Sequence, residues 1–307
     1  MVMINAKNAG YLQIDNRKPR IRQKEGVEIL PIKTAFDKYG WVRRQIRQKP
    51  DLGYFVWVKK SIDQELVSCM MICSKNQKQR VNNLMIIEPG VKTQVLGVCQ
   101  TKTTGLKGVH EGEVLIILKK GSSLRLKHGH HWSKTDKVKM KLRIKVGEGA
   151  SLIKEYKCVK TPKDLDIVTK IRVEKKAKVN LKTIILAKNG KVSLKELGEL
   201  TGDRAEAVIR LRLVATENSQ IKAESMMRAR GKSVGHVDCM GLVAGDEARI
   251  KVVPGLLNMD KFSSLTHEAS VGRIEKEKLD YLRTRGLSKQ QAIDLIVSGF
   301  LEIDGKI

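Results

Sequence analysis

The amino-acid sequence predicts a mainly β protein, in which a β-solenoid lies between a mixed N-terminal region and a C-terminal helical domain. Two observations indicate the solenoid. Short runs of alternating apolar and polar residues fill the middle of the chain, and turn residues separate those runs at a steady spacing. Hydrophobic residues make up 41% of the 307 residues, which is typical of a globular chain, so general disorder is excluded.

The N-terminal region, residues 1–78, is predicted to combine strands with a helix. Aromatic, β-branched or short apolar runs predict three strands, at 10–12, 27–30 and 54–58. Residues 31–48 carry apolar side chains three or four positions apart, which predicts a helix, and Gly40 lies inside it.

The predicted solenoid spans residues 79–255. From Gly121 onward the turn signals recur at intervals of about 14 residues, near positions 121, 135, 148, 163, 176, 190, 203, 217, 231 and 245. A unit of this length is too short to bury its own apolar face, but stacked units share one continuous core. The lack of helical patterns between the runs argues against a doubly wound α/β sheet. An antiparallel sandwich stays the alternative.

The C-terminal domain, residues 256–307, is predicted to be helical, with the helical texture beginning after Pro254. One side of a first helix carries four residues, Ile274, Lys278, Tyr281 and Leu282, and Gly286 is a suitable C-terminal cap. Ser288 followed by Gln291 is a capping box that predicts the start of a second helix, whose apolar stripe runs to residue 300.

The net charge of +27, from 60 basic and 33 acidic residues, suggests an acidic partner such as nucleic acid, anionic lipid or an acidic protein. The alternative is a solvated, lysine-rich surface of the kind common in heat-adapted proteins, and the even spread of basic residues favours it. Aromatic residues make up only 4% of the chain, so few side chains are available to stack on nucleic-acid bases. The chain shows neither a nucleic-acid-binding signature nor a glycine-rich phosphate loop.

The expected location is the cytoplasm. No apolar run approaches the roughly 20 residues of a membrane-spanning helix, and residues 1–6 do not follow the plan of a signal peptide. The five cysteines are scattered and odd in number, which fits reduced thiols better than a disulfide framework.

Two segments hold candidate chemical groups. In 235–242, alternation on a strand places Cys239 on one face and His236 and Asp238 on the other, so Cys239 is either a reactive thiol or a small buried residue of the core. In 265–272, the adjacent His267 and Glu268 point in different directions, and the simpler interpretation is the start of a helix with a polar cap.

Two further segments carry weaker metal signals. His128 and His130 would share one face of a strand and could supply two ligands to a metal ion, although no third ligand is evident. A polar strand edge is the alternative. Cys69 and Cys73 have the spacing of one helix side, but no second pair follows at zinc-site spacing, so a buried apolar segment is favoured.

Four segments near the C-terminus carry a specific signature, at 235–239, 265–274, 279–288 and 292–300. Through them the chain resembles the SufB/SufD family of iron–sulfur cluster assembly proteins, and in its length it is similar to the short archaeal type. The resemblance implies a right-handed parallel β-helix and an assembly scaffold that is not itself an enzyme. It also implies a SufC-type ABC ATPase as partner, which hydrolyses the ATP, and a transient iron–sulfur cluster formed where two β-helices meet. A homodimer or a paralogue heterodimer is expected, and flavin involvement stays open.

The resemblance assigns roles residue by residue. Cys239 matches the cysteine proposed to receive sulfur or ligate the nascent cluster, Glu268 matches a proposed cluster ligand, and His267 matches the histidine that SufD places at the same interface. The expected ATPase-docking residues lie in the helical domain: Tyr281, Leu282, Arg285, Gly286, Ile296 and Phe300. No role is implied for Cys158, His128 or His130, and Cys158 is only a possible second sulfur-handling residue.

Two other functions compete with the scaffold. A basic β-solenoid that binds nucleic acid is motivated by the charge of +27. A sugar-active solenoid enzyme would need paired carboxylates facing outward on adjacent turns, and the sequence offers no such pair.

Overall fold

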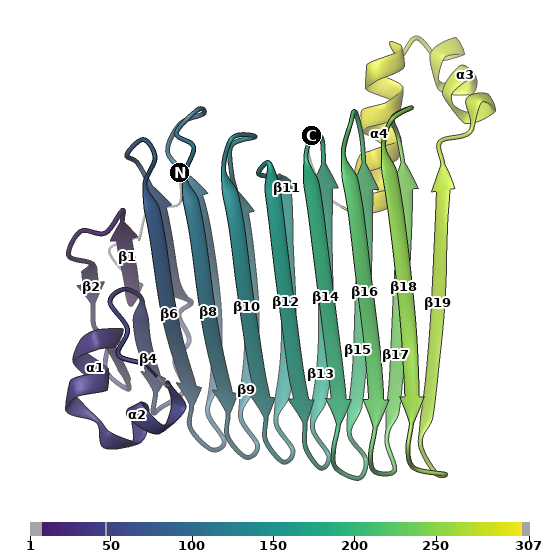
Figure 1. Ribbon diagram of the computed structural model, residues 1–307. Coiled ribbons are helices and arrows are strands. Elements are labelled where there is room, and N and C mark those ends of the chain that lie inside the picture. Colours follow the sequence, from purple (N-terminus) through teal and green to yellow (C-terminus); the bar gives the residue numbers. More distant parts are fainter. Residues whose placement is uncertain (1–7, 47, 303–307) are drawn as a thin grey trace.

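The computed structural model describes residues 8–46 and 48–302, and in them the chain forms a parallel β-solenoid of about 8 turns with a small helical part at its C-terminal end (Figure 1). Consecutive strands of the solenoid alternate between two sheets, so each turn contributes one strand to each sheet. The β-solenoid prediction is therefore confirmed, and the antiparallel sandwich is wrong, because the strands of the solenoid pair in parallel.

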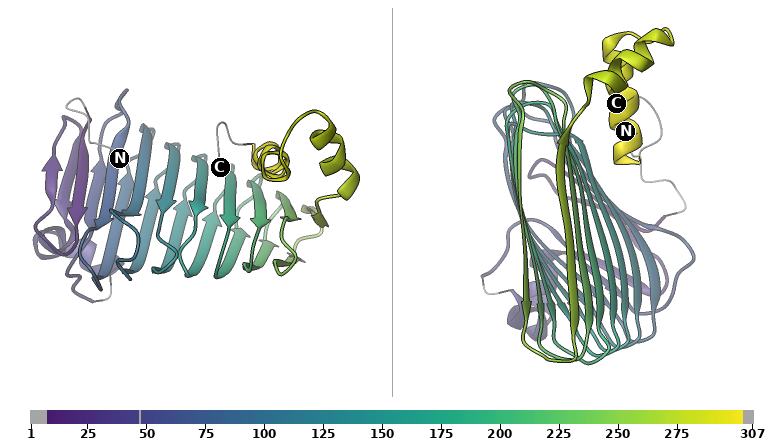
Figure 2. Two further views of the ribbon diagram at one scale, coloured as in Figure 1. Left: turned by 90° about the horizontal axis from the view of Figure 1, so that it is seen from above. Right: turned by 90° about the vertical axis from the view of Figure 1, so that its right-hand side faces the viewer.

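The first sheet holds ten strands in this spatial order: β2 (Arg20–Arg22), β1 (Gly10–Ile14), β5 (Leu66–Ile72), β7 (Lys92–Thr101), β9 (Ser123–His131), β11 (Ser151–Lys160), β13 (Lys178–Ala187), β15 (Glu206–Ala215), β17 (Val234–Val243) and β19 (Ser264–Arg273). The second sheet holds nine: β3 (Val27–Pro31), β4 (Tyr54–Val58), β6 (Lys78–Ile87), β8 (Val109–Leu118), β10 (Lys137–Val146), β12 (Asp164–Val173), β14 (Lys191–Leu200), β16 (Gln220–Ala229) and β18 (Arg249–Asn258). The two sheets face each other across one continuous core, which Figure 2 shows end-on.

Alternation along each strand separates the core from the surface. In β10 the buried residues Val138, Met140 and Ile144 point inward, while the lysines between them are exposed. Outward lysines face carboxylates on the neighbouring turn, as in the pair Lys141–Glu113 at 3.4 Å. The basic surface is thus solvated and partly neutralised between turns, in agreement with the lysine-rich-surface interpretation.

Helices cover the outer faces of the sheets at two places. Near the N-terminus, α1 (Ile32–Lys38) and α2 (Gly40–Gln45) pack over Phe55 and Leu84 of the second sheet. Near the C-terminus, α3 (Lys276–Thr284) leads to α4 (Lys289–Leu301), which packs on the first sheet. Among the described residues, no helix is long and apolar enough to cross a membrane.

Local signals in the sequence are confirmed at both ends. The three predicted strands appear as β1, β3 and β4, and the helix predicted at 31–48 appears as two short helices, because Tyr39 between them has an extended backbone. The Ser288 hydroxyl accepts from the Gln291 N–H in a complete capping box, and Gly286 has a φ of +89° after α3. Residues 1–6, where a signal peptide was considered, lie outside the described part.

The predicted domain boundaries are displaced. The parallel stack already begins with β1 and β4, which pair in parallel with β5 and β6, because α1 and α2 interrupt the spacing there without interrupting the sheets. The prediction that helical structure begins directly after Pro254 is wrong. Strand β18 continues through Pro254, and β19 extends the solenoid to Arg273. Proline is tolerated because β18 is the edge strand of its sheet, where a missing N–H breaks fewer ladder bonds.

Candidate functional site

In-register stacking aligns inward-facing side chains into columns that run along the solenoid axis. One column of the first sheet joins residues of seven successive strands, namely Ser68, Gly97, His128, Tyr156, Thr183, Leu211 and Cys239. Residues that are distant in sequence therefore become neighbours, and Cys239 lies near the C-terminal end of the column.

The Cys239 side chain is fully buried on the inward face of β17, beside Val237. His236 and Asp238 lie on the opposite face from Cys239, as alternation predicted, and that face is the outer one. His236 Nδ1 lies 2.8 Å from the Thr266 hydroxyl, and Asp238 accepts two hydrogen bonds from Arg212 at 2.9 and 2.7 Å. Burial raises the pKa of the Cys239 thiol to about 11, so the folded chain holds it as a neutral thiol at neutral pH.

His267 and Glu268 lie on β19, so the alternative of a helix start is wrong. The register pairs Val237 with His267 and Asp238 with Glu268. His267 therefore shares the inward side with Cys239, whereas Glu268 lies on the outer face of the sheet. Both are exposed, because β19 is the last strand of the stack. Within one chain, the strands bring Cys239 and His267 to the same side and separate both from Glu268.

The predicted ATPase-docking residues divide into two groups. Tyr281 and Arg285 are exposed on and after α3, and the Arg285 guanidinium lies 5.3 Å from the Tyr281 ring centre. Leu282 is half-buried and Gly286 is exposed. Ile296 and Phe300 are half-buried and pack, with other α4 residues, against the outer face of the first sheet. α4 is thus the anchor, and α3, which has no buried residue, projects beyond the solenoid (Figure 2).

The histidine pair gains a third partner that sequence analysis missed. His128 and His130 share one face of β9, as predicted; that face points inward, and Cys99 of β7 lies beside them. Cys158 is fully buried on β11, in register with His130. A signal for Cys99 existed, because two 14-residue units make one turn of the solenoid, and one turn before His128 is close to Cys99.

The other cysteine pair does not lie on a helix. Cys69 is on strand β5, where it is fully buried and packs with Met71 and Val98 on the outer face of the first sheet. Cys73 follows the strand and is half-buried. The helical interpretation is wrong, and the alternative of a buried apolar segment is confirmed.

Together, the parallel stack and the helical extension define a β-solenoid protein with a buried cysteine near the C-terminal end of its stack. Residues 70–300 match the family model described as SUF system FeS cluster assembly, SufBD core domain. The chain belongs to the SufBD family.

Curated relatives agree with this assignment. An iron–sulfur cluster assembly SufBD family protein of Archaeoglobus fulgidus is 31% identical, and the alignment covers 98% of this chain and 86% of the relative. A protein with the same description from Methanothermobacter thermautotrophicus is 28% identical over 91% of this chain and 74% of the relative. The iron–sulfur cluster assembly protein SufB of Bacillus subtilis is 22% identical over 81% of this chain and 55% of its own length. Family membership supports a role in iron–sulfur cluster assembly.

Thiol labelling should distinguish the buried and accessible cysteines. At pH 8 in the native state, an alkylating reagent should modify Cys73 and leave Cys239 unmodified, since a pKa of about 11 leaves only about 0.1% of that thiol ionised.

The burial of Cys239 also predicts that the stability of the fold depends on pH. The thiol of the unfolded chain ionises near pH 9, so the stability that Cys239 contributes is complete below that pH and is lost as pH rises toward 11.

Mass spectrometry of alkylated peptides measures the first effect, and urea unfolding from pH 8 to 11 measures the second. Cys239→Ala is the control, because its stability should fall less over that pH range than that of the wild type. Rapid native labelling of Cys239 would contradict its burial.

Proposed function

We propose that this protein is a scaffold that assembles a nascent iron–sulfur cluster where two β-helices meet, driven by a SufC-type ABC ATPase. The observation that carries the proposal is the position of Cys239 and His267 on one side of the last two strands of the first sheet, next to an uncovered end of the solenoid. Family membership supplies the chemical context. The cluster is the cargo of this reaction, and it leaves for a recipient protein.

The donor set suits temporary binding. Iron–sulfur clusters are held most firmly by thiolates, and permanent centres use several of them. Each chain offers Cys239 as one thiol near the open end, with His267 and Glu268 as weaker nitrogen and oxygen donors. In a two-fold pair each donor occurs twice, so Glu268 of one chain and Cys239 of its partner can face one another although they point apart within a chain.

The burial of Cys239 requires a movement before it can ligate iron, and the structure offers a mechanical connection. α4 packs against Val214 of β15 and Leu242 of β17, and Leu242 is three residues from Cys239 on the same strand. Lys182 of β13 pairs with Glu302 at the end of α4. Closure of the ATPase on ATP would pull on the helical domain, and α4 would transmit that rearrangement to the strand that carries Cys239.

The open end of the solenoid, which is the C-terminal end formed by β18 and β19, is suited to pairing with another chain. β18 and β19 are the edge strands of their sheets, with backbone groups that lack a further strand. Exposed apolar side chains gather there, namely Val253, Leu257, Met259, Phe262 and Val271. A second copy or a paralogue would cover these groups. The same proposal places the protein in the cytoplasm, where thiols such as its five free cysteines stay reduced.

Cluster loading tests the main proposal. After anaerobic addition of iron and sulfide, the wild type with its ATPase should show the visible absorption and Mössbauer spectrum of a cluster. Cys239→Ala should lose most of this signal, and His267→Ala and Glu268→Ala should weaken it, because each removes a donor. Cys73→Ala is the control thiol and should load normally. Unchanged loading in all three site variants would refute the proposal.

The self-pairing interface is tested by placing a charge at the open end. Val271→Glu puts a carboxylate on the inward side of β19, where 45% of the valine surface is exposed in the single chain. A dimer through this end should dissociate at least tenfold more readily, since burying an unpaired charge is costly. Val234→Glu, at an exposed position on the first residue of β17, is the matched control and should remain dimeric. Sedimentation equilibrium measures both, and equal dissociation constants would contradict this interface.

ATPase docking is tested on α3. Tyr281 is 59% exposed and stacks with Arg285, and such Tyr–Arg pairs commonly dominate binding surfaces. Tyr281→Ala should weaken binding of the purified ATPase at least tenfold. Lys278→Ala, whose ammonium pairs with Glu275 on the same helix, should change the affinity little. Titration calorimetry measures both, and the reverse ranking would exclude Tyr281 as a docking residue.

A further inference from the structure

Three side chains with metal-ligand atoms meet inside the solenoid, away from the open end. Cys99 comes from β7, and His128 and His130 come from the adjacent strand β9. Their ligand atoms all lie within 4.8 Å of one another. Cys99 Sγ is 3.5 Å from His128 Nε2. This matches the roughly 3.5 Å between sulfur and nitrogen donors on a tetrahedral zinc ion with bonds of about 2.3 and 2.0 Å.

A second observation concerns the ring nitrogens of His130. Its Nδ1 lies 2.7 Å from the Tyr156 hydroxyl, while its Nε2 is buried without a hydrogen-bond partner. A buried polar atom without a partner is costly and calls for a missing neighbour. Metal-bound histidines donate their other ring N–H to an oxygen atom, which fixes the ring orientation. Tyr156 is placed to accept that hydrogen bond from His130.

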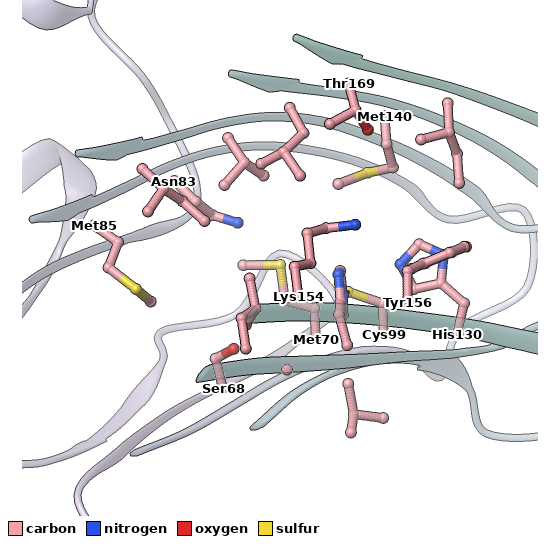
Figure 3. A pocket seen from close by; sticks show the side chains of 18 of the residues that line it. Ser68, Met70, Asn83, Met85, Cys99, His130, Met140, Lys154, Tyr156 and Thr169 are labelled. Carbon is pink, nitrogen blue, oxygen red and sulfur yellow. The ribbon is translucent and has the colours of Figure 1, made fainter. Parts of the chain in front are cut away.

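The cluster borders an enclosed space. A cavity of about 60 Å³ is lined by Cys99, His128 and His130, and Figure 3 shows Cys99, His130 and Tyr156 around it. A Cβ atom at Gly97 would come within 3.0 Å of the His128 ring, so the glycine leaves the room that the ring occupies. Met70 also lines the cavity and adds a soft thioether.

Burial around the three candidate ligands favours the uncharged forms of the side chains there. His130 is fully buried between the two sheets, a setting that disfavours a charged imidazole, and the neutral imidazole is the form that binds metals. Lys154 faces the same cavity, and its ammonium would oppose a cation, but burial also lowers its pKa. Glu196, further along the cavity, accepts a hydrogen bond from Thr183 at 2.7 Å.

We propose that Cys99 Sγ, His128 Nε2 and His130 Nε2 bind one thiophilic divalent metal ion of the Zn²⁺ class, with a fourth position open to the cavity. Binding forms one metal–thiolate bond and two metal–imidazole bonds and releases the thiol proton to solvent, and no electron is transferred. The sulfur and nitrogen donors select such ions over Mg²⁺ and Ca²⁺. The site is distinct from the cluster site, because four strand spacings, about 19 Å, separate His128 from Cys239 in the same column.

Cobalt binding tests this proposal on the full chain. The metal-free protein would receive Co²⁺ anaerobically, both in the native state and during refolding from urea, so that burial of the site cannot prevent loading. The expected result is a thiolate-to-cobalt charge-transfer band that saturates at one ion per chain and disappears when Zn²⁺ is added. X-ray absorption of the zinc form should show one sulfur and two nitrogen neighbours, with a Zn–S distance of about 2.3 Å.

Matched variants assign the ligands. Cys99→Ser and His130→Gln keep side-chain size and should weaken Co²⁺ binding at least tenfold, and Cys99→Ser should also remove the charge-transfer band. Cys158→Ser is the control, since Cys158 is a buried thiol in register with His130. Cys239→Ala should retain the band, which separates this site from the cluster site. The proposal is overturned if correctly folded wild type gives no band under either condition, if Cys99→Ser retains the band, or if Cys158→Ser loses it.

Discussion

The in-register stacking of parallel strands is the constraint on which the rest of this molecule depends. From β4 onward, each strand pairs with a strand about one turn away, so that residues 27 to 31 positions apart become neighbours, as with Lys137 and Asp164 or Lys92 and Ser123. This strand pairing determines which of the candidate metal and cluster ligands lie close together. It places Cys99 beside the histidines of the next turn and sets His267 diagonally across from Cys239.

The same rule limits what one chain can do. Because successive side chains alternate between the core and the surface, Cys239 and Glu268 point to opposite faces although their strands are hydrogen-bonded neighbours. A cluster that uses both must recruit a second chain or a movement of the strands. Burial also raises the pKa of this thiol, and the neutral thiol is less open to oxidation than a thiolate.

Sequence alone predicted whatever depends on local spacing. The period of 14 residues predicted the solenoid, alternation predicted that Cys239 lies on the opposite face from His236 and Asp238, and Ser288 with Gln291 predicted the start of α4. Sequence-based prediction was wrong or incomplete where the role of a residue depends on where its strand lies in the sheet. Pro254 indicates a strand end in isolation, but it is accommodated at a sheet edge. Cys99 precedes the regular series of turns, so the spacing alone brings it only close to the histidines, and the register of β7 with β9 shows that it pairs with His130 and lies beside His128.

The two ends of the solenoid differ in how readily they would admit a further strand. At the N-terminal end, the short antiparallel strands β2 and β3 close the sheets, and Arg20 and Arg22 place charge on the β2 edge. Short strands and charges discourage further strand pairing. At the C-terminal end, β18 and β19 are edge strands of ten residues each that expose apolar side chains such as Leu257 and Val271, although β18 also carries Lys251 and Pro254. Head-to-tail stacking would join unlike ends and grow into fibres, whereas pairing of two C-terminal ends about a two-fold axis covers both and leaves no free edge for growth.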